Sequence, residues 1–219
     1  MKIATWNLER PEKTGPRNAL LTEALHKVDA DILILTETNE SIQVGDGYTC
    51  FSTHSLKDHY YHPGERRTII YSRFPARRSC DTFNGDTSIC IESETPYGNL
   101  VIYGTVIGSH GNRKSSFNED LNLHLSDFER IHAEGPFCIS GNFNTSFCDN
   151  YYNAQYGRNR LNAAFDKLHL INLTADIPGN IDHIVISRHF MENKMFNIDT
   201  WNEDKKLSDH TGILVTLIP

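Results

Sequence analysis

Short apolar runs, each about the length of one β-strand, recur along the chain and limit the folds open to it. The clearest lies in residues 31–37, DILILTE, where the apolar residues stand together and the run ends at polar Thr36 and Glu37. Such a run is typical of a strand that is buried on both faces of a sheet. None of the runs approaches the roughly 20 residues that a membrane-spanning helix requires. The pattern predicts a fold built mainly on β-sheets and argues against a membrane protein.

Length and composition indicate one globular domain over residues 1–219. Hydrophobic residues make up 38% of the chain and charged residues 22%, proportions that exclude a disordered protein. A chain of this length buries roughly 70% of its unfolded surface, so it needs neither disulfides nor a structural metal to fold. We expect no obligate protein partner.

Charge and cysteine content narrow the function and the compartment. The formal net charge of −7 at pH 7 excludes binding of nucleic acid by bulk positive charge, but it leaves room for a local basic rim around a cleft. Five cysteines without a CxxC pair, in a chain that begins MKIATWNLER and shows no secretory signal, indicate reduced thiols. We therefore expect a cytoplasmic protein.

Apolar periodicity predicts strands with a few helices between them. Gly141 is expected to break the strand that starts at residue 136, and residues 54–65 and 109–116 are expected to be surface loops. The expected strands are 2–6, 31–37, 68–72, 88–92, 100–107, 136–139, 181–186 and 211–218, and the expected helices are 16–27, 117–131 and 160–168. This order predicts an α/β (α+β) fold in which two sheets pack face to face with helices outside.

Polar side chains stand at or near the ends of several predicted strands. A single carboxylate there is more often a cap or a turn residue. Several in one chain suggest a site, because rigid strands can deliver side chains into a crevice. The set consists of Asn7, Glu37, Asn142, Asn144, Asp182, Asp209 and His210.

Glu37 is the candidate metal ligand. A carboxylate that closes a buried strand suits a hard divalent cation such as Mg²⁺, which prefers oxygen ligands and keeps several waters. Asn7 could orient a phosphate or support that ligand, and Glu9, two residues on, could supply a second oxygen. The alternatives are a solvated strand end for Glu37 and a turn residue for Asn7.

The segment CISGNFN, residues 138–144, is the most informative part of the sequence. Asn142 and Asn144 are two residues apart and face one way in extended backbone. Their amides could bind a phosphate or an attacking nucleophile, but an amide cannot act as a general base. Asp182 and the pair Asp209-His210 supply the missing groups, because an Asp beside a His allows one to bind metal and the other to contact phosphate.

Five motifs, TWN, LTE, SGNFN, IDH and SDH, occur in this order between residues 4 and 214. Together they resemble the endonuclease/exonuclease/phosphatase superfamily, which includes deoxyribonuclease I and exonuclease III. The resemblance implies a four-layered αββα sandwich, two central mixed sheets flanked by helices, with a Mg²⁺ site at one end and Mn²⁺ able to replace Mg²⁺. It also implies that Glu37 is the principal metal carboxylate and Asn7 its neighbour.

The resemblance assigns roles to the remaining motif residues. Asn144 is implied to hold the phosphate or the attacking water, and Asp182 to orient His210. His210 is implied to contact the phosphate, and Asp209 to bind the metal or support it. Together these residues would hydrolyse a phosphoester by in-line attack of water, with metal and imidazole stabilising the charge of the transition state.

Asn142 departs from the family pattern, which reads Gly-Asp-Phe-Asn. The Asp is the residue held to position or deprotonate the attacking water, and its replacement by Asn could cost about 10²–10⁴-fold in rate. Two explanations compete. The chain carries a deliberate inactivating change, which the four intact motifs favour, or it is a natural binder that has lost catalysis.

Substrate-binding residues are less well marked. Many members of the superfamily place a catalytic His or Tyr where this chain has Val106, and His110, four residues later, could substitute for it. Arg66 and Arg67 could contact phosphate, since Arg suits bidentate recognition, or they could be a solvated strand edge.

Three functions follow as hypotheses. The leading one is a Mg²⁺-dependent phosphodiesterase that acts on nucleic acid, DNA or RNA, with aromatic and basic loops that stack bases and grip phosphates. A second is a hydrolase of a small phosphoester, such as a nucleotide, a phosphorylated sugar or a lipid headgroup. A third is a catalytically silent phosphate-binding module in which Asn142 is the natural residue.

Overall fold

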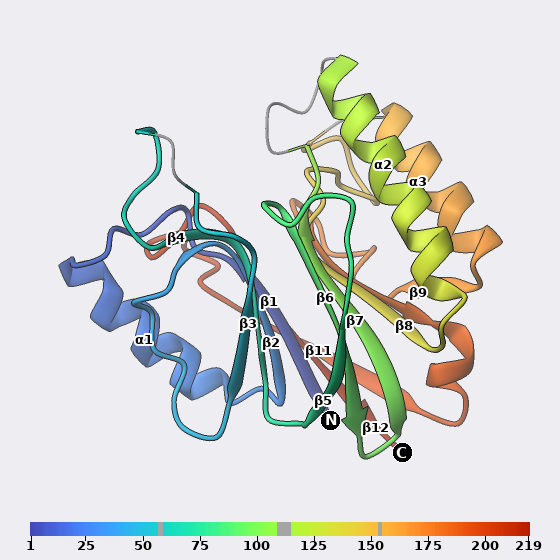
Figure 1. The fold of residues 1–219 in the computed structure, drawn as a ribbon, viewed down its shortest axis with the longest axis horizontal. Helices are drawn as coiled ribbons and strands as arrows, with labels where there is room; N and C mark the ends of the chain where they lie inside the picture. Colours follow the sequence, from blue (N-terminus) through green and yellow to red (C-terminus); the bar gives the residue numbers. More distant parts are fainter. Residues whose placement is uncertain (57–58, 109–114, 153–154) are drawn as a thin grey trace.

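Two six-stranded sheets packed face to face form the centre of the molecule, with helices on both outer faces (Figure 1). The computed structural model describes residues 1–56, 59–108, 115–152 and 155–219. Both sheets are mixed, because each contains one parallel pair among antiparallel ones. The predicted α/β (α+β) fold, a four-layered αββα sandwich, is confirmed.

The first sheet contains the first four strands of the chain and its last two. β1 pairs with β2 in parallel, so both strands end at the same edge. β12 runs antiparallel to β1 on its other side, which brings the end of the chain beside its beginning. The strand order is β11 (Met195–Trp201), β12 (Gly212–Ile218), β1 (Lys2–Asn7), β2 (Ile32–Asn39), β4 (Glu65–Ser72) and β3 (Thr49–Ser52).

The second sheet is built from the middle of the chain. β7 and β8 are parallel, and β10 runs antiparallel to β8 with Asp182 opposite Asn142. The start of β10 therefore lies at the edge where β8 ends. The strand order is β5 (Ala76–Cys80), β6 (Ser88–Thr95), β7 (Gly98–Val106), β8 (Phe137–Asn142), β10 (Asp182–Ser187) and β9 (Leu170–Asn172).

Helices cover the outer faces of the two sheets. α1 (Pro16–Val28) lies on the first sheet, and α2 (Ser115–His132) and α3 (Gln155–Lys167) lie on the second (Figure 1). A short 3₁₀ helix, η1 (Arg188–Met191), follows β10. No helix within the described ranges is long and apolar enough to span a membrane.

Apolar side chains fill the space between the sheets and the space beneath the helices. Ile3, Ile34 and Ile70 of the first sheet belong to the same buried cluster as Ile102 and Ile184 of the second. Two further clusters lie beneath α1 and beneath α2 and α3. This packing fixes the two sheets against each other and so fixes the edge where their strands end.

The structure corrects several sequence-based boundaries. Gly141 does not break its strand, because β8 continues through it to Asn142. Gly141 has φ 131°, and a Cβ there would lie 2.1 Å from the carbonyl oxygen of Thr105, so glycine is needed for the close approach of β7. α3 starts at Gln155, earlier than predicted, and β3, β5, β9 and β11 were not predicted.

Candidate active site

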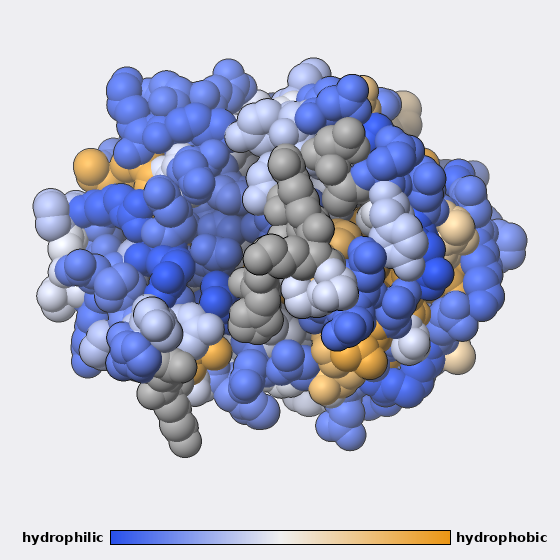
Figure 2. Space-filling view, turned by 90° about the horizontal axis from the view of Figure 1, so that it is seen from above, coloured by the Kyte–Doolittle hydropathy of each residue, from blue (hydrophilic) through white to orange (hydrophobic). Residues whose placement is uncertain are grey.

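Strands from both sheets end at one edge of the sandwich, and most of the predicted polar residues meet there. Asn7 ends β1, Asn142 ends β8, Asp182 begins β10, and His210 lies just before β12. Seen from above in the orientation of Figure 1, this face is mostly hydrophilic and is hollowed between the two halves (Figure 2). A pocket of about 240 Å³ is lined by Glu9, Glu37, Asn142, Asn144, Tyr151, Tyr152, Gly179, Asn180, Ile181, Asp182, Lys205, Asp209, His210 and Thr211.

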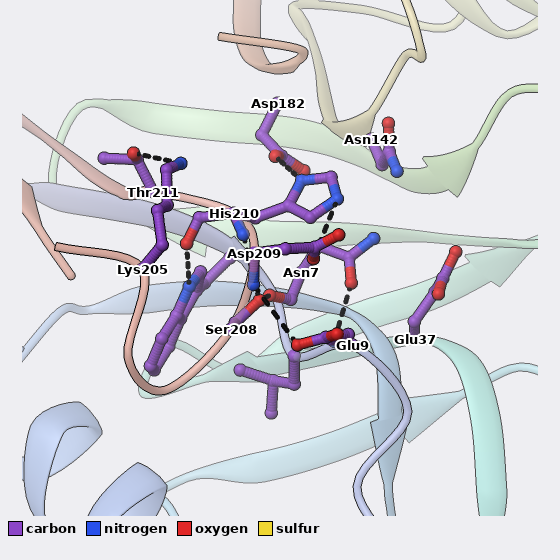
Figure 3. A network of polar contacts seen from close by, with 12 residues as sticks. Asn7, Glu9, Glu37, Asn142, Asp182, Lys205, Ser208, Asp209, His210 and Thr211 are labelled. Atoms are coloured by element: carbon purple, nitrogen blue, oxygen red, sulfur yellow. Dashed lines mark hydrogen bonds and ion pairs between the residues drawn. The ribbon is translucent and has the colours of Figure 1, made fainter. Parts of the chain in front are cut away.

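His210 and Asp182 form a close pair across the two sheets. The Nδ1 of His210 lies 2.5 Å from Oδ2 of Asp182, and its Nε2 lies 3.6 Å from Oδ1 of Asp209 (Figure 3). Burial by itself lowers the pKa of His210, but the charges of Asp182, Asp209 and Glu37 and the hydrogen bond that Nδ1 donates to Asp182 outweigh it and raise the pKa to about 9. The imidazole is therefore a cation at neutral pH. Its Nδ1 is hydrogen-bonded to Asp182, and its Nε2 points to the opposite side of the ring, toward Asp209.

The backbone around His210 is held by three side chains. Its N–H donates to Oγ of Ser208 at 3.1 Å, and Ser208 donates in turn to the carbonyl of Asn7 at 2.6 Å. Its carbonyl accepts hydrogen bonds from Nε1 of Trp6 at 3.0 Å and from Nδ2 of Asn202 at 2.7 Å. These contacts hold the SDH segment against the end of β1, so the backbone that carries the His210 ring is fixed in place.

Glu37 lies within β2, but its backbone has a positive φ of 44°, so the strand is irregular at this residue. Its side chain keeps 23% of its exposure, and Nη1 of Arg67 lies 3.8 Å from Oε1. Burial raises the pKa of Glu37, while Arg67, His210 and Asn7 favour the ionised form. A carboxylate in such a place gains by binding a further cation, because it is poorly hydrated.

Two buried polar atoms at the pocket have no well-formed hydrogen bond among the described residues. One is Nδ2 of Asn7, which is close enough to Glu37 to favour its ionised form, and the other is Oδ1 of Asp182. Unsatisfied buried polar atoms are costly and often mark the place of a ligand or water. Both lie at the edge where the predicted phosphate chemistry would occur.

Glu9 and Asp209 lie on the outer side of the pocket. Oε2 of Glu9 accepts the N–H of Asp209 at 3.2 Å and is paired with Nη1 of Arg17 at 3.2 Å. The Asp209 side chain is 67% exposed. Within the described ranges, no group of three or more His, Cys, Asp and Glu side chains is arranged to hold a metal ion. The donor set does not form a protein cage; it suits a Mg²⁺ ion held through Glu37, with waters and phosphate oxygens as the other ligands.

Asn142 and Asn144 form a turn at the end of β8. Oδ1 of Asn142 accepts the N–H of Asn144 at 2.8 Å, and Nδ2 of Asn144 donates to the carbonyl of Ile107 at 2.9 Å. Since the oxygen of Asn142 is fixed by this bond, its nitrogen is the atom left on the other side of the amide. Figure 3 shows Asn142 across the pocket from His210 and Glu37. An Asp at this position would keep the turn and replace that nitrogen with a second oxygen.

The predicted binding residues fare differently. Arg67 lies beside Glu37 and donates to the hydroxyl of Tyr61 at 3.2 Å. Arg66, its neighbour in β4, is paired with Glu40 at 3.0 Å, and neither arginine is among the residues that line the pocket. His110 lies outside the described residues.

Lys205 is a pocket residue that sequence reasoning missed. Its Nζ donates to Oγ1 of Thr211 at 2.6 Å, and burial lowers its pKa, opposed by Asp182 and Asp209. Its position five residues before His210 is the one sequence signal that could have pointed to it. Tyr151 and Tyr152, which follow the SGNFN motif in sequence, also line the pocket. Tyr151 is 60% exposed, so it is not packed in the core.

Comparison with known proteins supports the same fold over the whole chain. Solved structures with a similar fold include a 3′-5′ exonuclease (NExo) from Neisseria meningitidis, with 15% identity, TM-score 0.69 and coverage of 99% of both chains. They also include the AP endonuclease LMAP from Leishmania major, with 15% identity, TM-score 0.72 and coverage of 98% of this chain and 86% of that one. No curated protein matches the sequence. The sequence profile of the Endonuclease/Exonuclease/phosphatase family matches residues 4–210, and the chain belongs to this family.

Proposed function

We propose that the protein is a phosphodiesterase that hydrolyses nucleic-acid phosphodiester bonds with Mg²⁺, or with Mn²⁺ in its place, and that Asn142 weakens its activity. The observation that carries the proposal is the close contact of His210 with Asp182 in the same pocket as Glu37. An imidazolium and a carboxylate so arranged can receive a phosphate group with a bound cation between them.

Each residue has a defined task in this mechanism. His210 would donate from Nε2 to a phosphate oxygen and stabilise the charge that develops there, while Asp182 keeps the ring protonated. Glu37, supported by Asn7, would hold the cation, which when bound polarises the phosphate and its attacking water. Asn144 would orient the attacking water, because its amide oxygen can accept a hydrogen bond from water while its nitrogen donates to the carbonyl of Ile107.

The side chain at position 142 determines how fast we expect this chain to hydrolyse its substrate. Its amide can orient a water but cannot accept a proton from it, so the general-base contribution is lost. Such a contribution is typically worth about 10²–10⁴-fold in rate. The turn with Asn144 requires only an acceptor oxygen at position 142, which an aspartate also supplies.

A small phosphoester is the second candidate substrate. The pocket of about 240 Å³ has room for little more than a phosphate and a sugar, and the net charge of −7 opposes binding along an extended polyanion. A similar fold is seen in a 3′ phosphatase from Neisseria, solved as an Asp→Asn variant bound to product DNA, with 16% identity, TM-score 0.69 and coverage of 100% of both chains. That neighbour acts at a polymer end, which supports a nucleic-acid end as the substrate that meets both constraints.

The experiment compares this chain with its Asn142→Asp variant, each with Mg²⁺, with Mn²⁺ and with EDTA. The substrates are labelled single- and double-stranded DNA and RNA, an abasic duplex, a 3′-phosphorylated DNA end and a small phosphodiester. We expect the Asp variant to cleave a nucleic acid about 10²–10⁴-fold faster than the chain itself, and EDTA to abolish the reaction. Asn150→Asp makes the same chemical change at an exposed site and should leave the rate unchanged.

Two results would redirect the proposal. Hydrolysis of the small ester alone by the Asn142→Asp variant would replace nucleic acid with a small phosphoester. Phosphate binding without hydrolysis in either protein would identify a silent binding module. Adding His210→Gln to the Asp variant should abolish activity, which assigns the reaction to this pocket.

A further inference from the structure

Two of the five cysteines are buried directly opposite each other on neighbouring strands. Cys80 ends β5, Cys90 lies in β6, and the two residues are partners in the antiparallel register. Both belong to the apolar cluster beneath α2. Cys50 and Cys148 are exposed, and Cys138 belongs to the cluster between the sheets, on the other face of its sheet.

The backbone contacts of β6 show how closely the two cysteines approach. The carbonyl of Ser88 accepts from Oγ1 of Thr82 at 3.2 Å, and the N–H of Glu94 donates to the carbonyl of Pro75 at 3.0 Å, so both residues face β5. Alternate residues of a strand face the same neighbour, so Cys90 faces β5 as well. Directly opposed residues of this kind have Cα atoms about 5.5 Å apart, within the 5.5–6 Å that disulfides favour.

The two thiols differ in accessibility and acidity. Cys80 is 9% exposed on an edge strand, whereas Cys90 is fully buried. A hydrogen bond from the Cys90 thiol lowers the pKa of Cys80, with burial opposing it and the guanidinium of Arg78 assisting. The same contact and burial raise the pKa of Cys90. A small oxidant would therefore react first with Cys80.

We propose that Cys80 and Cys90 form a reversible disulfide in response to hydroperoxides. The Cys80 thiolate attacks one oxygen of hydrogen peroxide, the O–O bond breaks, and the products are a sulfenic acid on Cys80 and hydroxide, which takes up a proton. The sulfur of Cys90 then attacks the sulfur of Cys80 and the S–O bond breaks. The Cys90 proton leaves with the hydroxide as water. Two thiols and one peroxide give one disulfide and two waters.

The disulfide would close a short loop between β5 and β6 of the second sheet, and this loop is hydrogen-bonded to the first sheet. The loop spans residues 81–89, and Oγ1 of Thr68 donates to the carbonyl of Thr87 within it at 2.8 Å. The N–H of His54 donates to the carbonyl of Gly85 at 2.8 Å. Closing this loop restricts the unfolded chain, and we expect oxidation to raise the melting temperature by about 5 °C.

The test uses the full chain with Cys50→Ser and Cys148→Ser, which removes the exposed thiols. After treatment with hydrogen peroxide, denaturation and alkylation, we expect a mass loss of two hydrogens and a peptide that links Cys80 to Cys90. Dithiothreitol should restore the reduced mass and the original melting temperature. In a Cys90→Ser variant, Cys80 should instead accumulate sulfenic acid that dimedone traps.

Two outcomes would overturn the proposal. One is full alkylation of Cys80 and Cys90 after peroxide treatment that oxidises an exposed cysteine in the unmodified chain. The other is oxidation of Cys80 to sulfinic acid in the presence of Cys90. If Cys90→Ser fails to fold, mapping of the doubly substituted chain decides the question by itself. The inference does not depend on the proposed function.

Discussion

The pair formed by His210 and Asp182 keeps a proton that an exposed imidazole loses near neutral pH. His210 comes from the segment before β12 and Asp182 from the start of β10, so the pair also joins the two sheets. Its hydrogen bond of 2.5 Å and its low exposure make the interaction much stronger than one between surface groups. Both the positive charge of His210 and the position of its ring at the pocket therefore depend on its contact with Asp182.

Replacing Asp182 with Asn should convert His210 from a cation to a neutral imidazole at neutral pH. Without the Asp182 charge, the opposing effect of burial gains weight, and the pKa of His210 should fall from about 9 toward or below its ordinary 6.5. In the Asn142→Asp background, activity at pH 7.5 should drop at least about 10²-fold. NMR titration of the His210 ring gives the pKa, and Asp199→Asn, an exposed change, is the control. An unchanged pKa in the Asp182→Asn variant would contradict the assignment.

The raised pKa of His210 also predicts how stability depends on pH. A group whose pKa is higher in the folded state stabilises the fold fully below its unfolded value, here 6.5, and loses that contribution as pH rises through about 9. The shift corresponds to about 3 kcal/mol as an upper figure. Urea unfolding of the metal-free chain at pH 6 and pH 9.5, compared with His210→Gln, should show a larger loss for the chain itself. Parallel losses in both proteins would refute the linkage.

At the scale of elements, the parallel pairing of β7 and β8 positions the Asn142 turn. Gly141 lies so close to the carbonyl of Thr105 that any Cβ would force the strands apart. Asn142 opposes Val106 in the register of these strands, so a shift would displace the turn as well. Gly141 therefore helps to position the Asn142 turn at the pocket by allowing the backbones of β7 and β8 to approach closely.

Gly141→Ala should be among the most destabilising single changes in the chain. The added Cβ meets backbone 2.1 Å away, and we expect a loss of more than about 3 kcal/mol in the free energy of unfolding. Gly98→Ala is a matched control, because Gly98 also has a positive φ, 104°, but has open space around its Cβ position. It should cost about 1 kcal/mol. Denaturant unfolding of both variants measures the difference, and equal losses would show that backbone conformation alone explains the glycine.

Elements that are buried were predictable, and exposed ones were not. β2 and β10 are buried along nearly their whole length and read as apolar runs. β5 and β11 are edge strands with mostly exposed side chains, so their sequences carry no apolar alternation. These edge strands form because a neighbour, β6 for β5 and β12 for β11, offers a ladder of hydrogen bonds, and that ladder leaves no apolar signal in the sequence of the edge strand itself.

The residues of the candidate site also differ in whether the sequence could predict them. Residues such as Glu37 and Asp182 stand at the ends of apolar runs, so they could be picked out from the sequence as candidates, whereas their common edge was implied only by the family resemblance. The choice between Arg66 and Arg67 could not, because it depends on the register of β4. Lys205 reaches the pocket from a loop whose path is fixed by tertiary contacts.

For the whole molecule, net charge predicts how binding responds to salt. With a formal charge of −7, the cations that the described residues place at the pocket or beside Glu37 are Arg67, Lys205 and protonated His210. Contact with about three phosphates gives a slope near −2.7 for log affinity against log salt, or roughly a 40-fold loss between 50 and 200 mM. Fluorescence anisotropy with a labelled oligonucleotide in EDTA measures the slope. A slope steeper than about −6 would require an extended basic surface elsewhere.

The order of residues in the pocket has a consequence for biosynthesis. Asn7 and Glu37 leave the ribosome early, but His210 follows Glu37 by more than 170 residues, which takes roughly 10–35 s at ordinary rates of translation. During that interval β1 lacks β12, its neighbour in the finished sheet, and exposes an unpaired edge. Between the synthesis of Glu37 and that of His210 the pocket is incomplete and the edge of β1 is prone to aggregate, and both conditions end when the segment that carries His210 and β12 emerges and β12 pairs with β1.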